Sequence, residues 1–409
     1  YGCPITTNNP NKLKAGDTLY IRGGTYLENK IQFANSGTST APIIIKAYPG
    51  EKPIIDGGFT TVSAEIIPVF DIGALSGQGS HYITLDGLTI RRGSRANIRI
   101  SETMPATYIT IKNCDLMDFV AYNNSAQIYV DTTSDNITIE NNKMHGMQSY
   151  DLRASGVVIF KAGTLTIRNN EIYSTSNGIY YKHSIDDGKI SVIENNFIHD
   201  TSDLGMLWSR SDGIIRNNII YNVGIGIKVF DEASSCPDLE SKNNQLSHNT
   251  IVDAATGIYL SRSVSCPGAV NTTVKDNLIY NFTNSDHRGF DIYSWYSGSD
   301  TSNTTFDHNL IYSSSFSSPI RVLNNYYTTS TAPLAGIANI QQAPIFKDYA
   351  NKDFTLLPNS PGYKAASDGY DMGADTSLPP TPTPDGGGGG SNTPPPSSSS
   401  GGDSGGGSS

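Results

Sequence analysis

A degenerate repeat of 22 to 32 residues dominates the middle of this chain. Its clearest copies read ITIENNKMHG, LTIRNNEIYS, SVIENNFIHD and GIIRNNIIYN, between Ile137 and Asn222. The second Asn of each pair, and its equivalents further along, fall at Asn142, Asn170, Asn196, Asn218, Asn249, Asn277 and Asn309, and upstream Cys114 and Gly87 take the same register. Repeats of this length indicate a solenoid, a propeller or an array. Because the spacing varies, the sequence favours stacked coils joined by turns of different size.

Each repeat predicts three short strands. In GIYYKHS the residues alternate, so that Ile179 and Tyr181 face one way and Tyr180 and Lys182 the other. IDDG then predicts a turn, ISVIEN a second strand and FIHD a short third one. The inward Ile, Val and Leu of such a coil are buried only when neighbouring coils stack on them. The sequence therefore predicts an all-β, single-stranded parallel β-helix, a solenoid with Asn-rich turns.

The recurring Asn residues have a structural interpretation. An Asn side chain both donates and accepts hydrogen bonds, and its backbone tolerates a left-handed conformation. Amides stacked coil on coil can bond to one another in a ladder, as they do in cross-β assemblies. We therefore assign these residues to the bend between the second and third strands and not to a binding site.

Composition agrees with this fold and excludes several classes of partner. The 409 residues include 40 Gly and 23 Tyr, and no window shows a sustained helical period. No apolar run approaches the roughly 18 residues of a membrane span. The net charge of −10, without a Lys/Arg cluster, disfavours nucleic acid and anionic membranes as partners.

The chain divides into a folded part and a tail. We expect residues 1–376 to form one β-helix domain. Residues 377–409 are rich in Pro, Gly and Ser and offer almost nothing to bury, so they should be disordered. Such a segment can tether the domain to a surface or to a further domain, or act only as a solubilising tail.

The first residue and the cysteines bear on location. The chain begins at Tyr1 and not at Met, which predicts a removed signal peptide and a secreted or cell-surface protein. Cys236 and Cys266 lie in turns of successive coils, each followed by Pro, and are predicted to form a disulfide. Whether Cys3 and Cys114 pair stays open.

Three stretches carry a family resemblance. AGDTLYIRGGTY and APIIIKAYPGEKPIIDGG near the start, the Asn-ending repeats over 109–313, and the segment 339–376 resemble the right-handed parallel β-helix, or pectate-lyase-like, superfamily. This resemblance implies a right-handed helix and covers most of the chain. It identifies a fold and no substrate.

A ligand must bind on the outer side of the strand that begins each repeat, such as GIYYKHS, since the inner side is core. Flat aromatic rings there suit sugar rings, and cations suit carboxylate or sulfate groups. Cross-strand stacking and solvated ion pairs are the alternative interpretation. The outward residues that we predict to bind substrate are Tyr129, Phe160, Lys161, Tyr180, Lys228, Tyr259 and Arg262.

NGIYYKHS, followed one coil later by GMLWSR, resembles the chondroitinase B and alginate lyase group of polysaccharide lyases. The resemblance implies that Lys182 is the base of a β-elimination and that Arg210 or His183 holds the enediolate. Lys161 and Arg210 beside it would favour the uncharged amine. The sequence lacks the group's Asn-Gly-x-Glu signature, and Thr175 and Asn177 stand where its acidic calcium ligands would be, so a calcium site has no ligand motif here.

Two classes of function remain. The first is a polysaccharide lyase acting on an acidic, uronate-containing polysaccharide. The second is a non-catalytic extracellular β-helix that is glycan-binding, adhesive or structural. A glycosidase would need two carboxylates about 5–9.5 Å apart, for which Asp131 and Asp151 are the candidates. No zinc-site spacing, nucleotide-binding loop or GxSxG motif is present.

Overall fold

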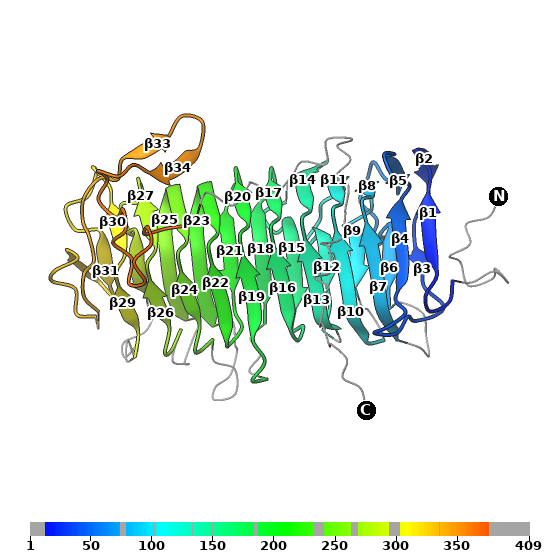
Figure 1. Ribbon diagram of the computed structural model, residues 1–409, viewed down its shortest axis with the longest axis horizontal. Coiled ribbons are helices and arrows are strands. Elements are labelled where there is room, and N and C mark those ends of the chain that lie inside the picture. The colour runs from blue at the N-terminus through cyan, green and yellow to red at the C-terminus, as the bar shows by residue number, and fades with distance from the viewer. Residues whose placement is uncertain are drawn as a thin grey trace, which may run out of the picture.

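The computed structural model describes residues 13–375, apart from 74–78, 101–103, 133, 149–150, 184–186, 232–240, 263–268, 294–302 and 335. These residues form a parallel β-helix whose coils stack along the long axis of the molecule (Figure 1). The described part contains strands and turns but no helix, so no helix in it could cross a membrane. The predicted fold class is confirmed.

Three faces run the length of the solenoid, and each coil contributes a strand to each. The first face consists of β1 (Thr18–Ile21), β4 (Ile43–Ala47), β7 (Ser80–Asp86), β10 (Ala106–Lys112), β13 (Ser134–Glu140), β16 (Leu165–Arg168), β19 (Ser191–Glu194), β22 (Gly213–Arg216), β24 (Gln245–Ser247), β26 (Thr273–Lys275) and β29 (Thr305–Asp307). All of these strands pair in parallel.

The second face follows the Asn-containing bend. It consists of β2 (Gly24–Leu27), β5 (Pro53–Asp56), β8 (Thr89–Arg91), β11 (Asp115–Phe119), β14 (Lys143–Met147), β17 (Glu171–Tyr173), β20 (Phe197–His199), the first halves of β23 (Ile219–Asp231) and β25 (Thr250–Arg262), β27 (Leu278–Tyr280) and β30 (Leu310–Tyr312).

The third face completes each coil. It consists of β3 (Ile31–Gln32), β6 (Phe70–Ile72), β9 (Ala96–Ile100), β12 (Ala126–Val130), β15 (Ser155–Phe160), β18 (Asn177–Lys182), β21 (Leu204–Trp208), the second halves of β23 and β25, β28 (Phe290–Tyr293) and β31 (Ile320–Val322), which β32 (Asn325–Tyr327) joins antiparallel. β23 and β25 pass from the second face to the third without a break, so these two faces form one continuous sheet.

The core is the column of inward side chains that the alternation predicts. In β13, Ile137 and Ile139 are buried while Thr138 between them is partly exposed. Ile179 and Tyr181 of β18 are fully buried as well. Burying an aliphatic side chain of this size contributes about 1.5–3 kcal/mol, and the cluster continues from coil to coil.

A ladder of buried amides runs through the bend between the first and second faces. This is the bend predicted between the second and third strands of a repeat, because the strand named first in each repeat lies on the third face. The side-chain amide of Asn170 donates to Oδ1 of Asn196 at 3.0 Å, and that of Asn196 donates to Oδ1 of Asn218 at 2.9 Å. Each Oδ1 also accepts the backbone N–H of the preceding Asn. The ladder extends from Asn142 to Asn339, which confirms the structural interpretation of these residues.

The first Asn of each pair has a different task. Asn141, Asn169, Asn195 and Asn217 all have φ between 54° and 56°, the left-handed conformation that Asn tolerates. Asp86 pairs with Lys112, so Gly87 is level with Asn113 and Leu88 is level with Cys114. Gly87, with φ of 74°, therefore takes the position of the first Asn and not the ladder position. The register predicted for Gly87 was therefore wrong by one residue.

Cys114 begins the ladder, since its backbone N–H donates to Oδ1 of Asn142. It is a free thiol, and burial raises its pKa to about 12. Cys3, Cys236 and Cys266 lie outside the described residues, so the disulfide between Cys236 and Cys266 stays a prediction.

The closing segment folds back over the second face. β33 (Phe346–Asp348) and β34 (Asp353–Leu356) form a hairpin, drawn in orange beside β23 and β27 in Figure 1. Phe354 packs against Tyr221, with ring centres 5.7 Å apart, and Ala374 donates its N–H to the Thr250 hydroxyl. Residues 376–409 lie outside the described part.

The ladder makes a prediction about stability. Replacing Asn196 by Ala removes the Oδ1 that accepts from the backbone N–H and the side-chain amide of Asn170, and it removes the amide that donates to the Ile167 carbonyl. The loss of these buried hydrogen bonds should cost about 3 kcal/mol of unfolding free energy. Asn195→Gly is the matched control, because Gly adopts a left-handed φ readily, and it should change stability by less than about 1 kcal/mol. Chemical denaturation measures both, and equal losses in the two variants would contradict the ladder's role.

Candidate functional site

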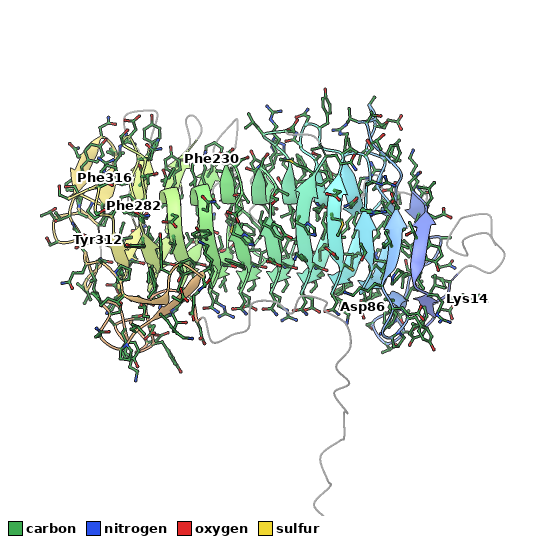
Figure 2. The ribbon with its side chains drawn as sticks, turned by 90° about the horizontal axis from the view of Figure 1, so that it is seen from above. Lys14, Asp86, Phe230, Phe282, Tyr312 and Phe316 are labelled. Carbon is green, nitrogen blue, oxygen red and sulfur yellow. The ribbon has the colours of Figure 1, made fainter. Side chains whose placement is uncertain are left out.

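The outward side chains of the third face form two rows. Pairing between strands places in one row Tyr129, Val158, Tyr180, Leu207, Lys228 and Tyr259. In the second row Phe160 is level with Lys182, and further along Phe230 is level with Ser261. Neighbours in a row are about 4.8 Å apart. We call this surface the lysine face; Phe230, labelled in Figure 2, marks it.

Lys182 points outward from the end of β18, as the alternation predicts. Its Nζ lies 3.4 Å from Oδ1 of Asn124 and 5.9 Å from the ring centre of Phe160. It forms no ion pair with any carboxylate of the described residues. Lys182 therefore lies beside an aromatic ring and an amide, partly shielded from water.

Two further basic residues come directly after strand ends beside Lys182. Lys161 and His183 are exposed, and the backbone N–H of Lys161 donates to the carbonyl of Lys182 at 3.3 Å. The His183 ring lies 5.7 Å from that of Phe160. Both have left-handed backbones, with φ of 46° and 64°, as do many turn residues of this solenoid. We call Lys161, Lys182 and His183 the basic cluster.

Aromatic rings flank this cluster. Tyr129 stacks on Phe160 with ring centres 5.2 Å apart, and Lys228 lies over Phe230 at 4.5 Å. Tyr180 is partly exposed in the same row as Tyr129. The predicted aromatic and cationic residues from Tyr129 to Lys228 are thus brought together on one face.

Tyr259 differs from the prediction. Its side chain is buried, covered by His287 at 5.1 Å and Tyr293 at 6.0 Å, and burial raises its pKa. It cannot serve as an exposed platform for a sugar ring. The physical reason is that His287 and Tyr293, which belong to the following coil, pack against its ring.

The prediction that Arg210 faces a ligand was wrong. Its side chain is fully buried, and it donates to Oδ1 of Asp187 at 2.6 Å and to the carbonyls of Lys189 and Ala162 at 2.8 and 3.0 Å. β21 ends at Trp208, so the alternation no longer governs the direction of Arg210. Arg210 instead holds the segment that follows the basic cluster.

The carboxylate pair needed for a glycosidase is not formed. Asp131 follows the end of β12, whereas Asp151 precedes the start of the neighbouring β15, so the length of a strand, about 16 Å, separates them. The Asp151 carboxylate accepts the backbone N–H groups of Asn123 and Arg153. Both observations disfavour paired acid catalysis by these residues.

Arg262, predicted to bind substrate, ends β25, but its side chain lies outside the described part.

The residues before Lys182 do not fit a calcium ion. The Thr175 hydroxyl donates to the Asn177 carbonyl, and both side chains are buried. Nowhere in the described ranges do three or more His, Cys, Asp or Glu side chains gather as a metal site would require.

Comparison with known proteins now adds a family. A model described as Pel9A-like, right handed beta helix region, matches residues 6–156, and a model described as right handed beta helix region matches residues 127–329. The chain belongs to the right-handed parallel β-helix superfamily. The predicted handedness is thereby confirmed.

Individual members of the superfamily are distant. Pectate lyase PEL9 of Emericella nidulans is 54% identical over 44 residues, a stretch that spans 10% of this chain and 11% of that protein. The crystal structure of pectate lyase Pel9A superposes with a TM-score of 0.57 at 14% identity, covering 89% of this chain and 88% of that one. A PL6 alginate lyase in complex with a trisaccharide gives 0.51 at 14% identity, covering 88% and 89%. At this identity the solved structures establish the fold alone.

Sequence reasoning missed three features of the lysine face. Burial raises the pKa of Asp203, and the positive charge of Lys228 acts on it in the opposite direction. Asn124 reaches Lys182 from a turn two coils away. The first row also continues at both ends into buried ion pairs, Asp71–Arg99 and Asp291–Arg321. In FDI, ANIRI, FDIY and IRV a charged residue alternates with apolar ones, and this pattern could have predicted that the row continues through these strands.

The new position of Arg210 leads to a prediction. Arg210→Ala should lower the unfolding free energy by about 3 kcal/mol, because it removes a fully buried guanidinium together with its ion pair to Asp187 and its hydrogen bonds to the Ala162 and Lys189 carbonyls. Arg216→Ala removes an exposed ion pair with Glu194 and should cost less than about 1 kcal/mol. Thermal or chemical denaturation distinguishes them. An Arg210→Ala protein as stable as the parent would mean that the side chain is free to face a ligand.

Proposed function

We propose that this protein is a polysaccharide lyase that cleaves an acidic, uronate-containing polysaccharide by β-elimination. The observation that supports it most is the basic cluster: Lys161 and Lys182 project from adjacent coils of an acidic protein, and neither forms an ion pair with a described carboxylate. Like charges held together in this way repel each other unless an anion binds between them. A uronate carboxylate is such an anion.

The chemistry assigns a role to each member of the cluster. The uncharged amine of Lys182 takes the proton from the carbon next to the uronate carboxylate, and Lys161 and His183 stabilise the charge that moves onto the carboxylate oxygens. The bond from the adjacent carbon to the leaving sugar oxygen then breaks, a carbon–carbon double bond forms, and that oxygen takes a proton from solvent. Arg210 acts only by holding the segment beside this cluster.

The neighbouring rings supply the binding surface. Phe160, stacked on Tyr129, lies beside Lys182 and offers an apolar face to a sugar ring. Lys228 lies two coils further along, so a second uronate of the same chain can reach it. An extended acidic polymer lying along the helix axis would contact both.

The location and the domain arrangement are part of this proposal. The proposed substrate is an extracellular polymer, so we propose a secreted or cell-surface protein. Residues 1–376 would form the catalytic β-helix, and residues 377–409 a tether to a surface or to a further domain.

The test uses two replacements of Lys182. With alginate, pectate or chondroitin as substrate, the parent protein should release unsaturated products, detected by the ultraviolet absorbance of the new conjugated double bond. Lys182→Ala should lower turnover about 100-fold or more. Lys182→Arg should still bind the polymer, but its turnover should be as low as that of Lys182→Ala, because a guanidinium keeps the charge and cannot act as a base.

The control is Lys46→Ala, which truncates an outward lysine of the first face that is ion-paired with Asp86. It should retain full turnover, and all three variants should fold, because solvent-side truncations change stability by about 0.5 kcal/mol or less. If the parent binds an acidic polymer and never forms the double bond, the protein is a non-catalytic glycan binder. If Lys182→Ala keeps both turnover and binding, the lysine face is not the site.

A further inference from the structure

The outer side of the first face carries a second surface unlike the lysine face. Tyr82 and Tyr108 project from β7 and β10 with their rings parallel, 1° apart in orientation and 4.5 Å between centres. Tyr108 is 47% exposed despite this contact. The rings border a shallow groove of about 370 Å³ that crosses several coils.

The backbone at these two tyrosines is unusual. Tyr82 and Tyr108 have left-handed φ of 53° and 57°, a conformation that is sterically disfavoured for a bulky residue. Asn136 takes the equivalent place in the next coil, because the residues before and after it pair with those before and after Tyr108; its φ is 54°. In that coil an Asn adopts the same backbone conformation without an aromatic ring, whereas the two tyrosines adopt it at a steric cost.

Hydroxyl groups continue the surface along the helix axis. One threonine from each of four successive strands lines the groove in strict register, namely Thr84, Thr110, Thr138 and Thr166. Their side chains make no hydrogen bond to any described residue. Since strands are about 4.8 Å apart, the groove offers a straight row of evenly spaced donors and acceptors.

The charges next to the groove cancel one another. The neighbouring outward row alternates in sign from coil to coil: Lys46, Asp86, Lys112, Glu140, Arg168, Glu194 and Arg216. Lys46 and Lys112 both pair with Asp86, and Arg168 pairs with Glu140 at 2.7 Å. Among the described residues, no charged side chain lines the groove itself. A surface of this kind attracts neither acidic nor basic polymers.

We propose that this threonine surface, formed by Tyr82, Tyr108, Asn136 and the four threonines, binds a neutral β-1,4-linked polysaccharide. Such a chain is an extended ribbon whose flat ring faces suit Tyr108 and whose hydroxyls repeat along a line, as the threonines do. Asn136 is shorter than a tyrosine, so the side of Tyr108 that faces the next coil adjoins the groove. The site lies on a different face from the basic cluster and does not depend on the proposed reaction.

The test measures binding to hydroxyethylcellulose, a soluble neutral β-1,4-glucan, by affinity electrophoresis. The polymer should retard the parent protein, and Tyr108→Asn should weaken binding about tenfold or more through loss of the aromatic contact. This variant should be at least as thermally stable as the parent, because Asn136 already adopts the same backbone conformation.

Tyr20→Asn is the matched control, since Tyr20 lies on the same face, is 49% exposed and does not line the groove. It should bind as the parent does, and an excess of polygalacturonate should not compete. The proposal is overturned if hydroxyethylcellulose does not retard the parent, if Tyr108→Asn binds unchanged, or if both variants lose binding equally. A loss of stability in Tyr108→Asn without loss of binding would show that the tyrosine pair only stiffens the coils.

Discussion

The buried amide ladder is the interaction on which the rest of this structure depends. Each coil differs in length, yet the second Asn of every repeat must reach the next one at hydrogen-bonding distance. Turns elsewhere absorb the differences, so the ladder fixes the register of all three faces. Because side chains alternate along each strand, fixing the register also aligns the outward residues into rows. The rows on the lysine face and on the threonine surface are consequences of this constraint.

Much of this arrangement could be predicted from the sequence, and the failures have identifiable causes. Alternation within β18 correctly placed Ile179 and Tyr181 in the core and Lys182 outside. It failed for Arg210, which lies beyond the end of its strand, and for Tyr259, which the next coil covers. The tyrosine pair carries no periodic signal at all, because it depends on a left-handed backbone that only the structure reveals.

Two faces of one scaffold thus differ in how their charges are compensated. On the first face, basic and acidic residues alternate between coils and pair with one another. At the basic cluster, Lys161 and Lys182 follow each other on adjacent coils with no described carboxylate between them. The first arrangement favours an uncharged ligand and the second an anionic one. A protein with both surfaces could hold a neutral polymer while acting on an acidic one embedded in it.

The most direct test of the account is a crystal structure of Lys182→Ala with an acidic oligosaccharide, since this variant should bind substrate without consuming it. We expect a sugar ring against Phe160 and a uronate carboxylate within hydrogen-bonding distance of Lys161 or His183. The carbon next to that carboxylate should face the space that the Lys182 amine occupies in the parent. An oligosaccharide bound only elsewhere, or with its carboxylate turned away from the basic cluster, would contradict the proposed lyase site.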